Sequence, residues 1–274
     1  MDPAVRAFHD LLRVPDAAVD LSRAALAVAR IEYPDLDEKH ELTRLDGLAG
    51  RVGVTRRTEP AVALERLRRF LFEEEGFRGN ADEYYDPRNS CLNDVLDRKL
   101  GIPITLSVLT IEMGRRVGLD IVGVGLPGHF FVSARVGSQA VLLDPFHGGS
   151  IITPSSAADV ASRAVGRPVK IEEAHWAPCS ARGIVVRMLR NLKTIYARRS
   201  DWARALGVVD RLLLIDADTP THLRDRGTVL VKAGRLWEGA AEWESYLNRY
   251  PHAQDAEAFR QELRRVRQEL GSRN

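Results

Sequence analysis

The sequence is poor in cysteine. Its 274 residues include only Cys91 and Cys179, too few for the disulfide framework that stabilises many secreted proteins. Residues 1–30 lack the continuous apolar segment of a secretory leader, because charged residues such as Asp10 and Arg13 interrupt it. We therefore expect reduced thiols and a cytoplasmic location.

A charge imbalance and long apolar runs are also missing. Lys and Arg number 40 against 38 Asp and Glu, a formal net charge of +2, so bulk charge does not support a nucleic-acid or membrane-surface role. The sequence has no run of about 18 apolar residues, so we expect no membrane-spanning helix. With 45% hydrophobic and 28% charged residues, the chain has the composition of a globular protein with one large or two ordinary domains.

Common zinc-binding patterns are absent as well. The sequence has no Cys-x-x-Cys and no His-Glu-x-x-His. Residues of the types that zinc accepts do occur without such spacing: Cys91, His129, Asp144 and His147, and the pair His175 and Cys179. We expect neither a metal nor another cofactor.

The first part of the chain predicts helices followed by a loop. Apolar residues recur with helical spacing at 17–31, 38–49 and 60–75, and Pro60 suits the first turn of the third helix. Residues 76–89 are rich in Gly, Asn, Asp and Tyr, which predicts a loop.

The middle of the chain predicts both helices and strands. Helices are expected at 91–99, 105–117 and 154–165, and Asn89 or Ser90 is expected to cap the first of them. Apolar, β-branched segments predict strands at 121–126, 129–136 and 140–144.

A turn at Gly137-Ser138 would fix the register of the last two strands. A two-residue turn there places Phe131 opposite Asp144, with His129 diagonal to Asp144 on the same sheet face. A shift by one residue would put His129 and Asp144 on opposite faces.

The last third of the chain predicts helices with a weak internal repeat. At an offset of 35 residues, Trp202 matches Trp237 and Ala205 matches Ala240, a period close to the 34 residues of tetratricopeptide helix pairs. We expect the three tryptophans Trp202, Trp237 and Trp243 to pack in the core. Residues 182–204 carry seven basic side chains and one acid, Asp201, which predicts a solvated basic helix face, so nucleic-acid binding is not favoured.

Cys91, His129 and Asp144 follow one another in settings that suit thiol chemistry. Cys91 is expected in the first helical turn, where backbone N–H groups favour a thiolate and could hold an oxyanion. His129 is a candidate base and Asp144 a candidate acceptor that orients it. Asn89 and Tyr85 are candidates for holding the oxyanion. Their alternative roles are a helix cap for Asn89 and loop packing for Tyr85.

Several strings in this region carry a family resemblance. Y-Y-D-P-R-N-S-C-L-N-D-V-L-D-R-K-L-G-I-P-I, G-V-G-L-P-G-H-F and D-P-F-H-G-G resemble the transglutaminase-like Cys-His-Asp superfamily. More narrowly, they resemble the transglutaminase-like branch of the SirB regulator family. Y-P-D-L-D at 33–37 and the tetratricopeptide-like tail also fit that family, so the resemblance covers nearly the whole chain. His147 departs from the family's usual D-P-F-N-G-G.

The resemblance implies an α+β fold and two alternative functions. The fold would be a papain-type transglutaminase-like core with helices in residues 1–166, followed by tetratricopeptide-like helices in residues 181–274. One function is a cysteine-dependent hydrolase or acyltransferase, in which Cys91 attacks an amide or peptide bond to form a thioester. The alternative is a non-catalytic scaffold that binds protein or peptide partners through the helical tail.

Overall fold

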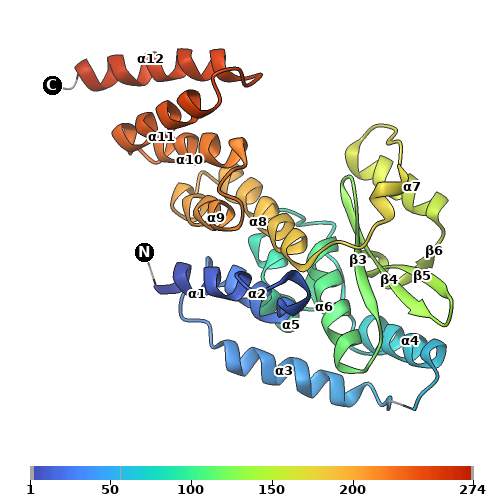
Figure 1. Ribbon diagram of the computed structural model, residues 1–274. Coiled ribbons are helices and arrows are strands. Elements are labelled where there is room, and N and C mark those ends of the chain that lie inside the picture. The colour runs from blue at the N-terminus through green and yellow to red at the C-terminus, as the bar shows by residue number, and fades with distance from the viewer. Residues whose placement is uncertain (1–2, 56, 273–274) are drawn as a thin grey trace. The chain divides into compact units, whose positions relative to one another are not determined.

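A computed structural model describes residues 3–55 and 57–272 (Figure 1). The chain forms two compact units, one of residues 10–188 and the other of residues 3–9 together with 189–272. The boundary between these units falls inside a helix, and the division into domains at residues 167–180 stays a prediction. No helix in the described ranges is long and apolar enough to cross a membrane.

The structure contains twelve α-helices among its described residues. They are α1 (Pro3–Leu12), α2 (Leu21–Ala29), α3 (Glu38–Arg51), α4 (Pro60–Arg69), α5 (Leu92–Arg98), α6 (Pro103–Arg116), α7 (Pro154–Val165), α8 (Ala181–Arg198), α9 (Trp202–Ile215), α10 (Pro220–Lys232), α11 (Leu236–Arg249) and α12 (Ala256–Ser272). Short 3-10 helices are η1 (Asp16–Ala18), η3 (Pro87–Ser90), η4 (Pro145–His147) and η5 (Glu173–Trp176), and η2 (Phe70–Glu74) is a π-helical turn.

The predicted helices of the first part are present, with changed ends. The helix expected at 17–31 is shortened to α2, because the Asp20 side chain caps its first turn by accepting from Arg23 N. The helix expected at 60–75 continues as predicted, but its last turn is the π-helical η2.

Four antiparallel strands form the main sheet in the order β3 (Ile121–Leu126), β4 (His129–Val136), β5 (Gln139–Asp144) and β6 (Ser150–Ile152). Val132 pairs with Leu143 and Val136 pairs with Gln139, so the predicted register across Gly137-Ser138 is confirmed. The three-residue strand β6 was not predicted, since it is too short to show an alternating pattern.

The two faces of the sheet are covered by different helices. Val124, Leu126 and Phe131 share one face and form a core cluster with Ala157 and Ala161 of α7. On the opposite face Phe130 lies over Gly123, where a Cβ would come within 2.7 Å of the Phe130 ring. Because side chains alternate along a strand, His129 shares the face of Phe131.

A second, two-stranded sheet joins the two ends of the segment that contains η3 and α5. Its parallel strands are β1 (Arg78–Gly79) and β2 (Leu100–Gly101). Arg78 N donates to Lys99 O at 2.9 Å and Asn80 N donates to Gly101 O at 3.0 Å. The loop predicted at 76–89 therefore begins inside a sheet.

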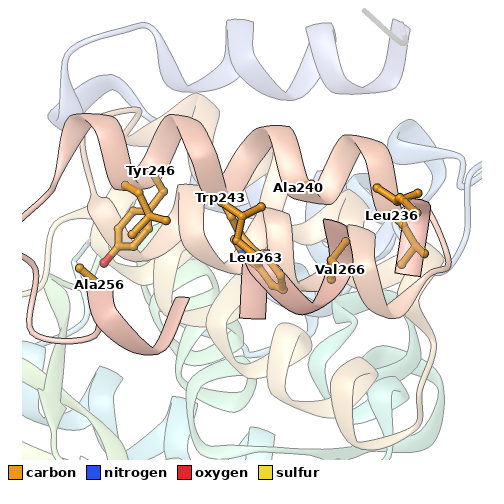
Figure 2. Packing of buried hydrophobic residues seen from close by; sticks show 9 residues of the cluster. Leu236, Ala240, Trp243, Tyr246, Ala256, Leu263 and Val266 are labelled. Carbon is orange, nitrogen blue, oxygen red and sulfur yellow. The ribbon is translucent and has the colours of Figure 1, made fainter. Parts of the chain in front are cut away.

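The repeat in the last third of the chain corresponds to two helix pairs, α9 with α10 and α11 with α12. Figure 2 shows Trp243 and Tyr246 of α11 packed with Leu263 and Val266 of α12. The matched residues Ala205 and Ala240 are both buried, as close helix packing requires.

The expectations for the tryptophans and for the basic helix were partly wrong. Trp243 is buried, but Trp237 in the first turn of α11 is 69% exposed. In α8, Arg182 donates to Leu12 O at 2.7 Å and Arg187 donates to Leu126 O at 2.8 Å. These two side chains bind backbone carbonyls, because α8 lies against the loop and sheet that expose them, so they do not form a solvated face.

Candidate functional site

His129 and Asp144 lie side by side on neighbouring strands of the main sheet. His129 opens β4, Asp144 ends β5, and His129 Nε2 lies 2.9 Å from Asp144 Oδ1. The confirmed strand register brings them together, as the sequence predicted. Both side chains are almost completely buried, with 4% and 1% exposed.

A second imidazole contacts the other carboxylate oxygen. His147 Nδ1 lies 2.7 Å from Asp144 Oδ2, and the Asp144 carboxylate also accepts from Phe146 N at 3.0 Å and His147 N at 3.3 Å. Burial of Asp144 acts to raise its pKa, but the hydrogen bonds and charges of His129 and His147 outweigh burial, so its pKa lies below the usual value. The carboxylate is therefore ionised at neutral pH.

Aromatic rings enclose His129. The ring of Phe131 is 4.4 Å from that of His129, and Phe146 meets it edge-on at 5.9 Å. Tyr84 in turn packs on Phe146, with its ring at 6.2 Å. Because His129 Nε2 faces Asp144, Nδ1 is the ring nitrogen that this contact leaves for chemistry.

Three side chains at this place have the composition of a metal site. The ligand atoms of His129, Asp144 and His147 all lie within 4.8 Å of one another. In the parts of the chain that the structure describes, they are the one such group of three, and Cys91, His175 and Cys179 are not members.

Cys91 occupies different surroundings. It is the residue before α5, with no exposed area, and its Sγ donates to Pro87 O at 3.5 Å. The prediction of Asn89 or Ser90 as the helix cap was wrong, because both belong to η3, which ends directly before Cys91. No hydrogen bond joins Cys91 to His129 among the residues the structure describes.

The electrostatics around Cys91 favour the neutral thiol. Burial raises the pKa of Cys91 well above its ordinary value, and the carboxylates of Asp94, Glu32 and Asp86 raise it further. The backbone N–H of Cys91 already donates to Arg88 O at 3.3 Å, so it does not point freely toward an oxyanion. With seven residues, α5 also offers only a weak dipole.

Asn89 and Tyr85, the two candidates for holding an oxyanion, differ in exposure. Asn89 is fully buried, its amide donates to Glu83 O at 2.7 Å, and its carbonyl accepts from Asn80 Nδ2 at 3.1 Å. These bonds give Asn89 a structural role inside the loop, which differs from the helix cap that was predicted for it. Tyr85 is 47% exposed and stacks edge-on against Tyr84 at 5.3 Å, which is the packing role considered for it.

Two known protein families match separate parts of this chain. A family model described as the transglutaminase-like superfamily matches residues 39–190, the segment that contains the sheet and the His129–Asp144 pair. The chain belongs to the transglutaminase-like superfamily. A tetratricopeptide repeat model matches residues 192–264, which confirms the nature of the helix pairs.

UPF0162 proteins from bacteria resemble this transglutaminase-like protein over most of its length. A UPF0162 protein of Xylella fastidiosa (strain Temecula1) is 36% identical over 261 residues, covering 93% of each chain. One from Vibrio cholerae is 26% identical over 93% of this chain and 92% of its own. The mouse F-box only protein 21 is 32% identical over 83 residues, which are 30% of this chain and 13% of that protein. No solved structure matches.

Sequence reasoning missed a side chain that supports the transglutaminase-like site from behind. Arg187 Nη2 donates to Leu126 O at 2.8 Å and to His129 O at 2.6 Å, and its guanidinium lies 5.1 Å from the Phe130 ring centre. Burial lowers the pKa of Arg187. Arg187 therefore holds the β3–β4 hairpin that presents His129. Its only sequence signal was an arginine on the inner side of an amphipathic helix, surrounded by Ile184, Val185 and Met188.

Proposed function

We propose that this transglutaminase-like protein is a non-catalytic scaffold that binds a protein partner through its tetratricopeptide region. The observation that carries the proposal is the state of Cys91, which is buried and hydrogen-bonded to Pro87 O. Its neighbours Asp94, Glu32 and Asp86 disfavour the thiolate that a nucleophile requires. A fold that keeps its thiol neutral and covered is suited to binding rather than covalent chemistry.

The tetratricopeptide region supplies the surface for this function. Tetratricopeptide repeats expose extended surfaces that suit protein recognition, and Trp237 presents a large apolar side chain that is 69% exposed. Tryptophan is one of the residues that contribute most to binding energy at protein interfaces. We propose Trp237 as a contact of the partner.

The finer family assignment and the location belong to the same proposal. The motif strings around Cys91, His129 and Asp144 support membership of the transglutaminase-like branch of the SirB regulator family. Two cysteines without a disulfide framework support a cytoplasmic location.

A second candidate function is a cysteine-dependent hydrolase or acyltransferase, and the specific observation in its favour is the His129–Asp144 pair at 2.9 Å. In this reaction His129 Nδ1 takes the thiol proton, Asp144 stabilises the imidazolium, and Sγ of Cys91 attacks the carbonyl of an amide. The amine leaves with the proton from His129, and water or another amine then cleaves the thioester. Asn89 or Tyr85 would hold the oxyanion. The mechanism needs Cys91 to leave Pro87 and approach His129.

The alkylation of Cys91 distinguishes the two functions. The rate with iodoacetamide would be measured against pH in the parent and in His129→Ala, with the partly exposed Cys179 as the internal control. The scaffold predicts that Cys91 reacts far more slowly than Cys179 in both proteins. Fast reaction below the ordinary thiol pKa of about 8.5, lost in His129→Ala, would instead establish a thiolate–imidazole pair and the catalytic function.

Partner binding is tested with the full chain. Proteins co-purifying with the parent, Trp237→Ala and Tyr85→Ala would be identified and quantified, Tyr85 being a matched exposed aromatic outside the repeats. The proposal expects one partner to be retained by Tyr85→Ala and by Cys91→Ala, but reduced at least about tenfold by Trp237→Ala. Equal recovery with all variants would exclude Trp237 as the contact.

A further inference from the structure

We propose that His129, Asp144 and His147 form a binding site for a divalent transition-metal ion, with zinc as the best-suited ion. Each of the three side chains offers one ligand atom within 4.8 Å of the other two, and His129 Nε2 and His147 Nδ1 are the nitrogens that contact the Asp144 carboxylate. Two imidazole nitrogens and one carboxylate are a donor set that zinc accepts in sites with three protein ligands. Calcium and magnesium prefer oxygen donors, so the two nitrogens disfavour them.

The distances suit an ion after a small adjustment. Ligand atoms about 2.0–2.2 Å from a tetrahedral zinc ion lie roughly 3.3–3.6 Å from one another. The nitrogens of His129 and His147 are now 2.9 and 2.7 Å from oxygens of Asp144. Relative to the carboxylate oxygens, the imidazole nitrogens would therefore move outward by about 0.4–0.9 Å to reach this separation. The two rings are nearly parallel, with an interplanar angle of 16° and centres 5.6 Å apart, and one nitrogen of each ring contacts one oxygen of the Asp144 carboxylate.

The backbone around the three side chains is fixed in advance. Asp144 accepts from two backbone N–H groups of η4, and Gly149 N donates to Asp144 O at 2.9 Å. The chain then turns through Gly149 with φ of 68°, where a Cβ would collide with Phe72. His129 is held by the Arg187 bond to its carbonyl. Such preorganisation reduces the cost of assembling a metal site.

The site has an open side. His129 and Asp144 are buried, but the His147 side chain is 55% exposed, so an ion can reach the carboxylate past this residue. Three protein ligands leave a fourth coordination position for water. His147 thus acts as the ligand that closes the site from the solvent side.

An ion bound here would also affect the acid–base chemistry of His129. Coordination through Nε2 leaves the neutral imidazole with its proton on Nδ1, so Nδ1 could not accept a proton from a thiol. This consequence rests on the second candidate function above, whereas ion binding itself does not.

The test measures binding directly with untagged protein. Zinc affinity would be determined by competition with a chromophoric chelator, and cobalt would be added to record the visible bands of a four- or five-coordinate ion. The parent, His147→Asn and Asp144→Asn would be compared with His252→Asn, an exposed histidine of the other unit as matched control. We expect His147→Asn to weaken zinc binding by at least about 100-fold, more than loss of an outer-shell partner, and His252→Asn to have no effect.

The His147→Asn variant keeps the result interpretable. Because this side chain is more than half exposed, its replacement should leave the circular dichroism spectrum and melting temperature unchanged, even if Asp144→Asn is unstable. Zinc affinity that is the same in the parent and in His147→Asn would overturn the proposal, as would a cobalt spectrum dominated by thiolate charge transfer. Neither outcome depends on whether Cys91 reacts with iodoacetamide, so the metal proposal and the functional proposals fail separately.

Discussion

The surroundings of His129 and of Cys91 differ, although both residues are buried in the same compact unit. His129 has the Asp144 carboxylate as a partner at 2.9 Å, and the His147 imidazole contacts the other oxygen of that carboxylate. Among the described residues, the Cys91 thiol has only the backbone carbonyl of Pro87 as its hydrogen-bond partner. Three carboxylates add to the electrostatic cost of ionising the thiol. A histidine–aspartate pair is thus conformationally ready for proton transfer, while the thiol is held in its neutral form.

The largest effect on the His129 side is expected from Arg187→Met. The substitution removes the charged donor to Leu126 O and His129 O and leaves those carbonyls without it. Hydrogen bonds from charged groups contribute about 1.5–3 kcal/mol each, so we expect a loss of about 3 kcal/mol in the free energy of unfolding. Urea unfolding would measure it, with the exposed Arg190→Met on the same helix as control. Equal stability of the two variants would contradict the bracing role of Arg187.

A somewhat smaller, pH-dependent effect is expected from Asp144→Asn. The folded-state pKa of Asp144 is depressed, so its ionised form stabilises the protein above the unfolded pKa of about 3.9, and this contribution is lost as pH falls through the folded-state value. We expect a deficit of about 1–3 kcal/mol at neutral pH that shrinks in acid. Unfolding free energies measured across this range give the result, and a deficit independent of pH would show that the carboxylate charge is not responsible.

The smallest effect is expected from Cys91→Ser on the His129 side. The serine hydroxyl can donate to Pro87 O as the thiol does. The substitution leaves the contacts of His129 with Asp144 and the surrounding rings unchanged. The NMR resonances of the His129 imidazole should therefore coincide in the parent and the variant. Displaced resonances would reveal an interaction between the thiol and the imidazole, and would favour the catalytic function.

The His129–Asp144 pair could be predicted because it depends on local sequence. The two residues are joined by one hairpin, and the turn at Gly137-Ser138 fixes which side chains share a face. The helices α3 and α7 and strands β3 and β4 were predicted for the same reason, since periodicity and turn residues lie within each segment.

The environments of Cys91 and Arg187 could not be predicted, because they depend on contacts between distant segments. The pKa of Cys91 responds to Glu32, which precedes it by many residues, and Arg187 reaches carbonyls of a hairpin far before it in the chain. The same holds for η3, whose 3-10 geometry moved the helix start past Asn89 and Ser90. Local sequence patterns identify residues that could take part in chemistry, and tertiary contacts determine whether those residues are reactive.

The short parallel pairing of β1 with β2 makes the exposure of Cys91 depend on how often the segment between these strands opens. The two strands tie together the ends of the segment that contains Tyr85, Asn89 and Cys91. Solvent can reach the thiol only when this segment opens locally, and the frequency of such openings is set by a local free energy rather than by the acidity of the thiol. The rate of Cys91 alkylation would then report how often this segment opens. It could be compared with the rates of amide hydrogen exchange at Arg78 and Asn80.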